Sequence, residues 1–133
     1  MKTKHLQITL LFVFVSVSII ANAQVKRYVK PTATGTGDGS PWANASGNIQ
    51  NMITASVSGD SVFVMKGTYT RTTGTFLIRM KEGVKVYGSF QGTESALHQR
   101  VIGTSAADSS RLNGNGSPTV GVATTSLTTA SVL

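Results

Sequence analysis

One stretch of the chain carries apolar residues at helical spacing. Between residues 48 and 57 they fall at positions i, i+3, i+4 and i+8, which places them on one face: Ile49, Met52, Ile53 and Val57. Ser46 or Asn48 is suited to cap the start of this helix, and the Gly59-Asp60 pair is typical of its end. Because so short a helix is only marginally stable alone, we expect its apolar face to pack against another element.

After residue 60 the pattern changes to short apolar runs separated by turn residues. Runs rich in Val, Ile, Phe, Tyr and Thr alternate with Gly, Ser, Asn and Asp, which predicts short β-strands. The clearest candidates are residues 61–65, 76–80 and 84–87, with weaker ones at 101–102, 119–123 and 129–133. No helix-length segment separates these strands, so an alternating β-α sheet is disfavoured and the predicted fold class is all-β.

Two of the predicted strands share a motif. Val62-x-Val64-x-x-Gly67-x-Tyr69 recurs as Val84-x-Val86-x-Gly88-x-Phe90, and a repeat period of about 20 to 25 residues is typical of one solenoid coil. In such a coil the alternate valines point inward and stack, while Phe63 and Lys85 face outward. The predicted inner stack is Val62, Val64, Val84 and Val86. A β-sandwich with hairpins of similar spacing is the alternative.

The order of these pieces resembles a known family. A Tyr28-Val29-Lys30-Pro31 segment precedes a glycine-rich loop that ends in Pro41-Trp42, and the helix and the two valine motifs follow. This order resembles the exported surface proteins of the pectate-lyase-like superfamily. The resemblance implies a truncated right-handed parallel β-helix with a short N-terminal capping helix. It also implies a structural cap over the first coil, made by Trp42, Ile49, Met52 and Ile53.

The N-terminus has the pattern of a signal peptide. Lys2 and Lys4 give a basic start, residues 6–20 are mostly apolar, and Ala21-Asn22-Ala23 supplies small residues at the cleavage site. We therefore predict a cleaved signal peptide over 1–23. A membrane anchor is the alternative, but the apolar run is shorter than the roughly 20 residues that span a bilayer. The predicted location is secreted or on the outer cell surface, with no transmembrane span after cleavage.

The remaining chain divides into two predicted parts. Residues 24–58 hold the first strand, the glycine-rich loop that ends in Trp42 (the tryptophan loop) and the capping helix. Residues 59–133 hold the first β-helix rungs, incomplete at the C-terminus, where residues 129–133 look like a strand without a cap after it. Such an open edge is also expected to permit self-association.

Composition narrows the class of partner. The chain has no cysteine, so its exported part holds no disulfide. Its formal net charge is +7, of which Lys2 and Lys4 contribute two charges. Export disfavours nucleic acid as a partner, and a basic surface outside the cell favours polysaccharide, lipid head groups or other cell-surface molecules. A scatter of solvated charged side chains is the simpler alternative.

Candidate chemistry is sparse. The five acidic residues are dispersed along the chain: Asp38, Asp60, Glu82, Glu94 and Asp108. Asp60 and Glu82 occupy similar places in the two repeats, yet polar caps on turns explain both. Hydrolysis of glycosides needs two close carboxylates, and His98 is the sole histidine after the predicted signal peptide. We predict no catalytic residue, no metal site and no cofactor.

Together these features predict a non-enzymatic, exported or cell-surface β-helix segment with a structural or adhesin-like role, in contact with glycans. The alternative is the N-terminal fragment of a polysaccharide lyase or glycoside hydrolase whose catalytic residues lie beyond Leu133.

Overall fold

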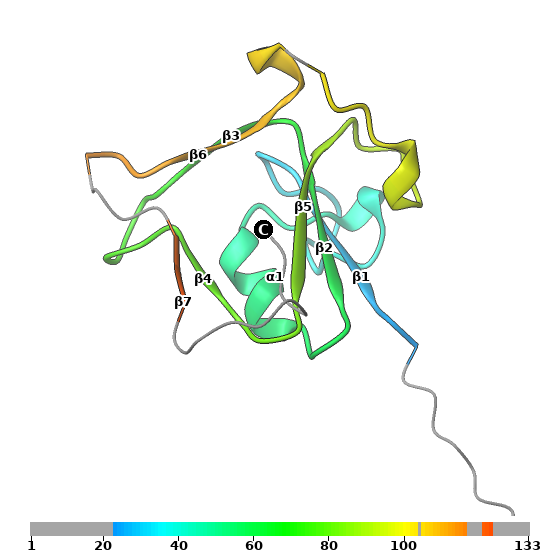
Figure 1. The fold of residues 1–133 in the computed structure, drawn as a ribbon, viewed down its shortest axis with the longest axis horizontal. Helices are drawn as coiled ribbons and strands as arrows, with labels where there is room; N and C mark the ends of the chain where they lie inside the picture. The colour runs from blue at the N-terminus through cyan, green and yellow to red at the C-terminus, as the bar shows by residue number, and fades with distance from the viewer. Residues whose placement is uncertain (1–22, 104, 117–120, 124–133) are drawn as a thin grey trace, which may run out of the picture.

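The structure is a computed structural model that describes residues 23–103, 105–116 and 121–123 (Figure 1). One α-helix is described, α1 (Ile49–Ala55), and no helix in these ranges is long and apolar enough to span a bilayer. The described strands are β1 (Lys26–Val29), β2 (Ser61–Met65), β3 (Gly67–Thr70), β4 (Ile78–Met80), β5 (Lys85–Phe90), β6 (Ser110–Asn113) and β7 (Gly121–Ala123). The predicted signal peptide and the candidate strand at 129–133 lie outside the described residues.

The strands form three small parallel sheets. One sheet has the order β1-β2-β5, and the other two are the pairs β3-β6 and β4-β7. The three sheets surround α1, which packs against β1, β2 and β4 (Figure 1). Because every strand pair in the described ranges is parallel, the antiparallel hairpins of a β-sandwich are not found there.

The predicted right-handed parallel β-helix is wrong. The described strands are short and belong to three separate small sheets beside one helix, and no solenoid is found in them. Coils of a solenoid repeat at a nearly constant chain length, but here the chain between paired residues varies greatly. Lys26 is opposite Ser61, Ser61 is opposite Lys85, and Gly67 is opposite Ser110.

The strand register expected from the valine repeat is also wrong. Val62 lies opposite Val86, and Val84 lies just before β5 begins, so the two motifs are shifted by two residues from the predicted alignment. The register changes again between Phe63 and Met65, where Ser89 takes a positive φ of 68° in the facing strand. Similar sequences therefore do not occupy equivalent positions in this sheet.

Helix α1 begins and ends close to the predicted points. The Asn48 side chain accepts a hydrogen bond from the Asn51 amide at 3.0 Å, which caps the N-terminus. The helix ends at Ala55, two residues earlier than the apolar pattern predicts. Val57 consequently leaves the helical face and is 58% exposed.

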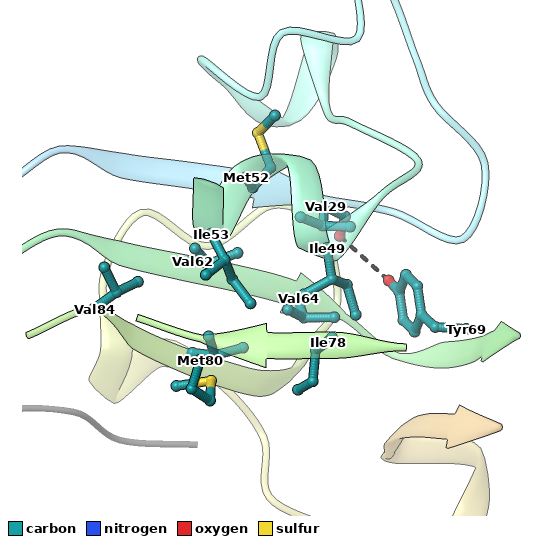
Figure 2. Close-up of a cluster of buried hydrophobic side chains, with 11 residues drawn as sticks. Val29, Ile49, Met52, Ile53, Val62, Val64, Tyr69, Ile78, Met80 and Val84 are labelled. Carbon is teal, nitrogen blue, oxygen red and sulfur yellow. Dashed lines mark hydrogen bonds between the residues drawn. The ribbon is translucent and has the colours of Figure 1, made fainter. Parts of the chain in front are cut away.

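The core lies between α1 and one face of the three-stranded sheet (Figure 2). Side chains alternate along a strand, and the buried face of β1, β2 and β5 carries Val29, Val62, Val64 and Val86. The full buried cluster joins these to α1 and β4: Val29, Ile49, Met52, Ile53, Val62, Val64, Tyr69, Ile78, Met80, Val84 and Val86. Burial of such side chains stabilises the fold by roughly 1.5 to 3 kcal/mol each, as an upper estimate.

The opposite face of the same sheet is aromatic. Tyr28, Phe63 and Tyr87 are cross-strand neighbours, and Phe63 stacks on Phe90 at a ring-centroid distance of 4.3 Å. Phe63 faces away from the inner valines, as expected, yet it is only 2% exposed. The reason is that the tryptophan loop covers this face, with Trp42 packed against Tyr28 at 4.8 Å and Phe90 at 5.9 Å.

Candidate functional site

The predicted cap residues divide between the two faces of the sheet. Ile49, Met52 and Ile53 belong to the buried cluster under α1 (Figure 2), whereas Trp42 packs in the aromatic layer. Its indole N–H donates to the Glu94 carbonyl at 2.6 Å. The tryptophan loop still reaches α1 through Gly39, because a Cβ there would lie 2.3 Å from Met52 Sδ. The predicted inner-stack valines are all buried.

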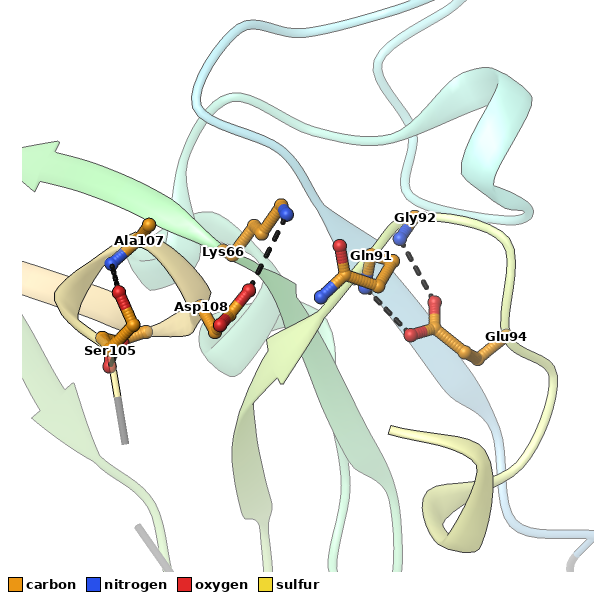
Figure 3. Close-up of polar contacts among 8 residues, drawn as sticks. Lys66, Gln91, Gly92, Glu94, Ser105, Ala107 and Asp108 are labelled. Carbon is orange, nitrogen blue, oxygen red and sulfur yellow. Dashed lines mark hydrogen bonds and ion pairs between the residues drawn. The ribbon is translucent and has the colours of Figure 1, made fainter. Parts of the chain in front are cut away.

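Two carboxylates support the backbone. Asp60 is 2% exposed and accepts from the Val25 and Val57 amides, both at 2.9 Å, so it joins the end of α1 to the start of β1. Glu94 accepts from the amides of Gln91, Gly92 and Thr93 at 2.7 to 3.0 Å (Figure 3). Burial raises the pKa of Glu94, but these backbone hydrogen bonds lower it by more, and the net pKa lies below its usual value.

The other described acids have local partners. Asp38 accepts from the Ser40 amide and the Thr36 hydroxyl. The Ser40 side chain, then the Ser40 amide and the Thr36 hydroxyl, lower the pKa of the Asp38 carboxyl. Asp108 lies 3.7 Å from Lys66 Nζ (Figure 3). Glu82 is exposed. In the ranges that the structure describes, no group of three or more His, Cys, Asp or Glu side chains stands together to hold a metal ion.

A groove of about 580 Å³ lies between the start of α1 and the segment that links β3 to β4. One wall is residues 47–51 with Pro31, and the other is residues 68–77. Tyr69 lies in the second wall with its ring buried and its hydroxyl donating to the Met65 and Val29 carbonyls at 2.8 and 3.3 Å. This burial raises the pKa of Tyr69, so its hydroxyl stays a neutral donor.

Hydrogen bonds from both walls hold the groove in place. The Gln50 side chain accepts from the Arg79 amide, which ties α1 to β4. Arg71 donates through Nε to the Gly114 carbonyl at 2.9 Å and through Nη1 to the Gly74 carbonyl. The linking segment is therefore fastened at both ends despite its polar, glycine-containing sequence.

The groove offers many hydrogen-bonding groups and positive charge. Its lining includes five exposed threonines: Thr68, Thr70, Thr72, Thr73 and Thr75. None of the lining residues among those that the structure describes is acidic. Arg71 lines the groove, Arg111 donates to Thr68 Oγ1 at 3.1 Å, and Arg79 stacks over the Phe76 ring at 4.3 Å. The site can therefore bind a polyhydroxylated ligand through hydroxyl, amide and guanidinium groups.

Sequence reasoning missed this groove. The aromatic residues of the valine motifs are unsuited to stacking on a sugar, because Tyr69 and Phe90 are buried and Tyr87 packs against Phe63. The signal that was present is the alternation of threonine with Tyr69 and Arg71 over residues 68–75. It does not reveal that residues 47–51 form the facing wall.

Comparisons of the chain with protein-family models, with curated proteins and with solved structures found no match. The resemblance to pectate-lyase-like surface proteins therefore stays a prediction from the sequence.

Proposed function

We propose that this chain is a non-enzymatic, exported or cell-surface module with a structural or adhesin-like role, and that it contacts glycans through the threonine-lined groove. The single observation that carries the proposal is the groove itself. It combines five exposed hydroxyl side chains with a nearby set of arginines, and its described lining has no acidic residue.

The chemistry of the lining suits a sugar. A threonine hydroxyl donates one hydrogen bond and accepts others, as a sugar hydroxyl does, so the two can pair in either direction. Phe76 is half-buried in the groove wall, beside these hydroxyls, and the Arg79 guanidinium lies over its ring. An aromatic ring next to hydrogen-bonding groups gives a binding surface for molecules with both apolar and polar faces.

A binding role without catalysis is supported by how the acids are used. Asp60 and Glu94 accept backbone hydrogen bonds, and neither lines the groove. Glycoside cleavage by the common two-carboxylate route requires two carboxyl groups on either side of the bond. The part of the groove lining that the structure describes supplies no carboxyl group.

The test is glycan binding by a variant that loses one groove hydroxyl. Thr70 lines the groove on β3, and Thr70→Val keeps the branched shape while removing the hydroxyl. Glycan arrays select a ligand, and calorimetry then measures affinity for the unchanged protein, Thr70→Val and the control Thr93→Val. Thr93 is exposed outside the groove.

We expect Thr70→Val to weaken binding by about three- to tenfold, the size of one lost hydrogen bond, and Thr93→Val to leave it unchanged. Absence of binding to any glycan, or an equal effect of both substitutions, would refute the groove as the site. Cleavage of the bound oligosaccharide would refute the non-enzymatic role.

A further inference from the structure

A second surface feature lies away from the groove, in the segment that follows β5. Residues 91–100 fold back over the aromatic face of the sheet and are fastened there by three hydrogen bonds. Trp42 donates to the Glu94 carbonyl, Lys26 Nζ donates to the Ser95 carbonyl at 2.7 Å, and Arg100 Nη1 donates to the Gly88 carbonyl at 3.4 Å. The base of this segment is therefore well anchored.

The tip of the anchored segment exposes aliphatic side chains. Leu97 is 37% exposed, Val101 56% and Ile102 71%, and Ile102 is the most exposed of the large hydrophobic residues in the described ranges. Figure 1 shows residues 97–103 in yellow at the rim of the molecule, outside the three sheets. Single exposed hydrophobic residues are common, but three within six positions form a local apolar tip.

Two basic side chains lie beside this tip. Lys26 Nζ contacts Ser95, two residues before Leu97, and Arg100, directly before Val101, has its guanidinium over the Tyr87 ring at 5.4 Å. The part of the chain that the structure describes gives neither cation a carboxylate partner. Nearby, Glu94 is directed into its own backbone turn, and Asp108, whose carboxylate lies against Gly103, faces Lys66. The tip therefore combines exposed aliphatic groups with uncompensated cations.

We infer that residues 97–102 form a docking tip for an anionic lipid surface. Val101 and Ile102 enter the interfacial layer of the bilayer, and Lys26 and Arg100 lie at the depth of the anionic head groups. Aliphatic insertion combined with basic residues is the pattern by which peripheral proteins bind such surfaces. The charge complementarity selects lipid as the occupant, and the inference is independent of glycan binding in the groove.

The absence of cysteine allows a local test. A single cysteine in place of Val101 can be labelled with a polarity-sensitive dye, because the natural chain has no cysteine. Val57→Cys is the matched control, since Val57 is 58% exposed and precedes β2. The full chain is used, and the readout must be local because the apolar residues 6–20 are themselves expected to bind vesicles.

With vesicles of phosphatidylglycerol and phosphatidylcholine, we expect the dye at position 101 to shift to the blue while the dye at position 57 does not. Phosphatidylcholine alone should give no shift at position 101, and neither should the mixed vesicles at about 1 M salt, where screening is strong. Equal responses at positions 101 and 57, or no response at 101 with anionic vesicles, would overturn the inference.

A binding measurement gives a second, quantitative check. Ile102→Ser should weaken partition of the labelled tip into anionic vesicles by roughly tenfold or more, the size of losing one buried isoleucine. Val57→Ser should leave partition unchanged. Because Ile102 is exposed, the substitution is not expected to unfold the protein, and a thermal melt verifies this. Unchanged partition of Ile102→Ser would contradict insertion of the tip.

Discussion

Asp60 and Glu94 are the two carboxylates that most strongly organise the backbone of this protein. Each is nearly buried and accepts hydrogen bonds from main-chain amides of segments that have no other regular structure. A charged acceptor makes stronger hydrogen bonds than a neutral one, and removing it leaves several part-buried amide donors without that acceptor. Glu94 also supports the aromatic face of the sheet, because its backbone carbonyl accepts a hydrogen bond from the Trp42 indole N–H.

Substitution of Glu94 tests this role. Glu94→Gln removes the charge and replaces one accepting oxygen by a donor, so the amides of Gln91, Gly92 and Thr93 can no longer all be satisfied. We expect the free energy of unfolding to fall by about 1 to 3 kcal/mol in urea denaturation at neutral pH. The control Glu82→Gln, at an exposed position, should change it by about 0.5 kcal/mol or less.

The loss of stability caused by Glu94→Gln should also depend on pH. Because the pKa of Glu94 in the folded protein lies below its usual value of 4.5, its stabilising effect is present above that value. The effect is lost as the pH falls through the lowered pKa and the carboxylate is protonated. The stability difference between the natural protein and Glu94→Gln should therefore shrink below about pH 4.5. A difference that stays constant or grows in acid would show that the charge is not the cause.

At the scale of elements, the structure confirms the strand predicted at residues 61–65 and a helix close to the predicted one. Both have strong periodic patterns. Strand β6 was missed because its sequence, Ser-Arg-Leu-Asn, has one apolar residue, and it forms by pairing with β3. The predicted strand at 101–102 is an exposed loop. Propensity alone cannot separate an apolar pair in a strand from one at a surface tip.

The start of β3 depends on a glycine that sequence reasoning assigned only to a turn. Gly67 has a φ of 134°, and a Cβ there would lie 2.6 Å from Pro31 Cγ. Gly74 has a φ of 77° in the same groove wall, but a Cβ added there would meet no atom within 4 Å. Both glycines therefore oppose a side chain through their positive φ, and Gly67 adds a steric conflict with Pro31.

We expect Gly67→Ala to lower the free energy of unfolding more than Gly74→Ala does. Gly74→Ala should cost about 1 kcal/mol, since only the left-handed backbone conformation opposes it, and Gly67→Ala should cost roughly 1 to 3 kcal/mol more. Chemical denaturation of both variants measures the difference. Equal losses would mean that the contact between Gly67 and Pro31 is not tight in solution.

At the scale of the whole molecule, sequence patterns predicted parts better than their assembly. The valine motifs identified strands that share a sheet, yet the repeat gave the wrong register and a solenoid that is not found. A repeat of alternating residues reports which face of a strand is buried and contains little information on which strand lies beside it. The proposed export, location and self-association remain predictions.

The same limit applies to predicting the binding groove from the sequence. Its walls, residues 47–51 and 68–77, come together because α1 packs against β4 and because Arg71 and Gln50 fasten the linking segment. The hydroxyl-rich wall is visible in the sequence, but its partner wall is fixed by tertiary packing. Only one of the two walls of the candidate site could therefore be predicted from the sequence.

The most direct test of the account is a two-dimensional NMR titration of the folded protein with the oligosaccharide selected on the arrays. We expect amide shifts to change together in residues 47–51 and 68–77, the two walls of the groove, and the oligosaccharide to be recovered intact. Shift changes confined to other surfaces, or cleavage of the oligosaccharide during the titration, would contradict glycan binding by this groove.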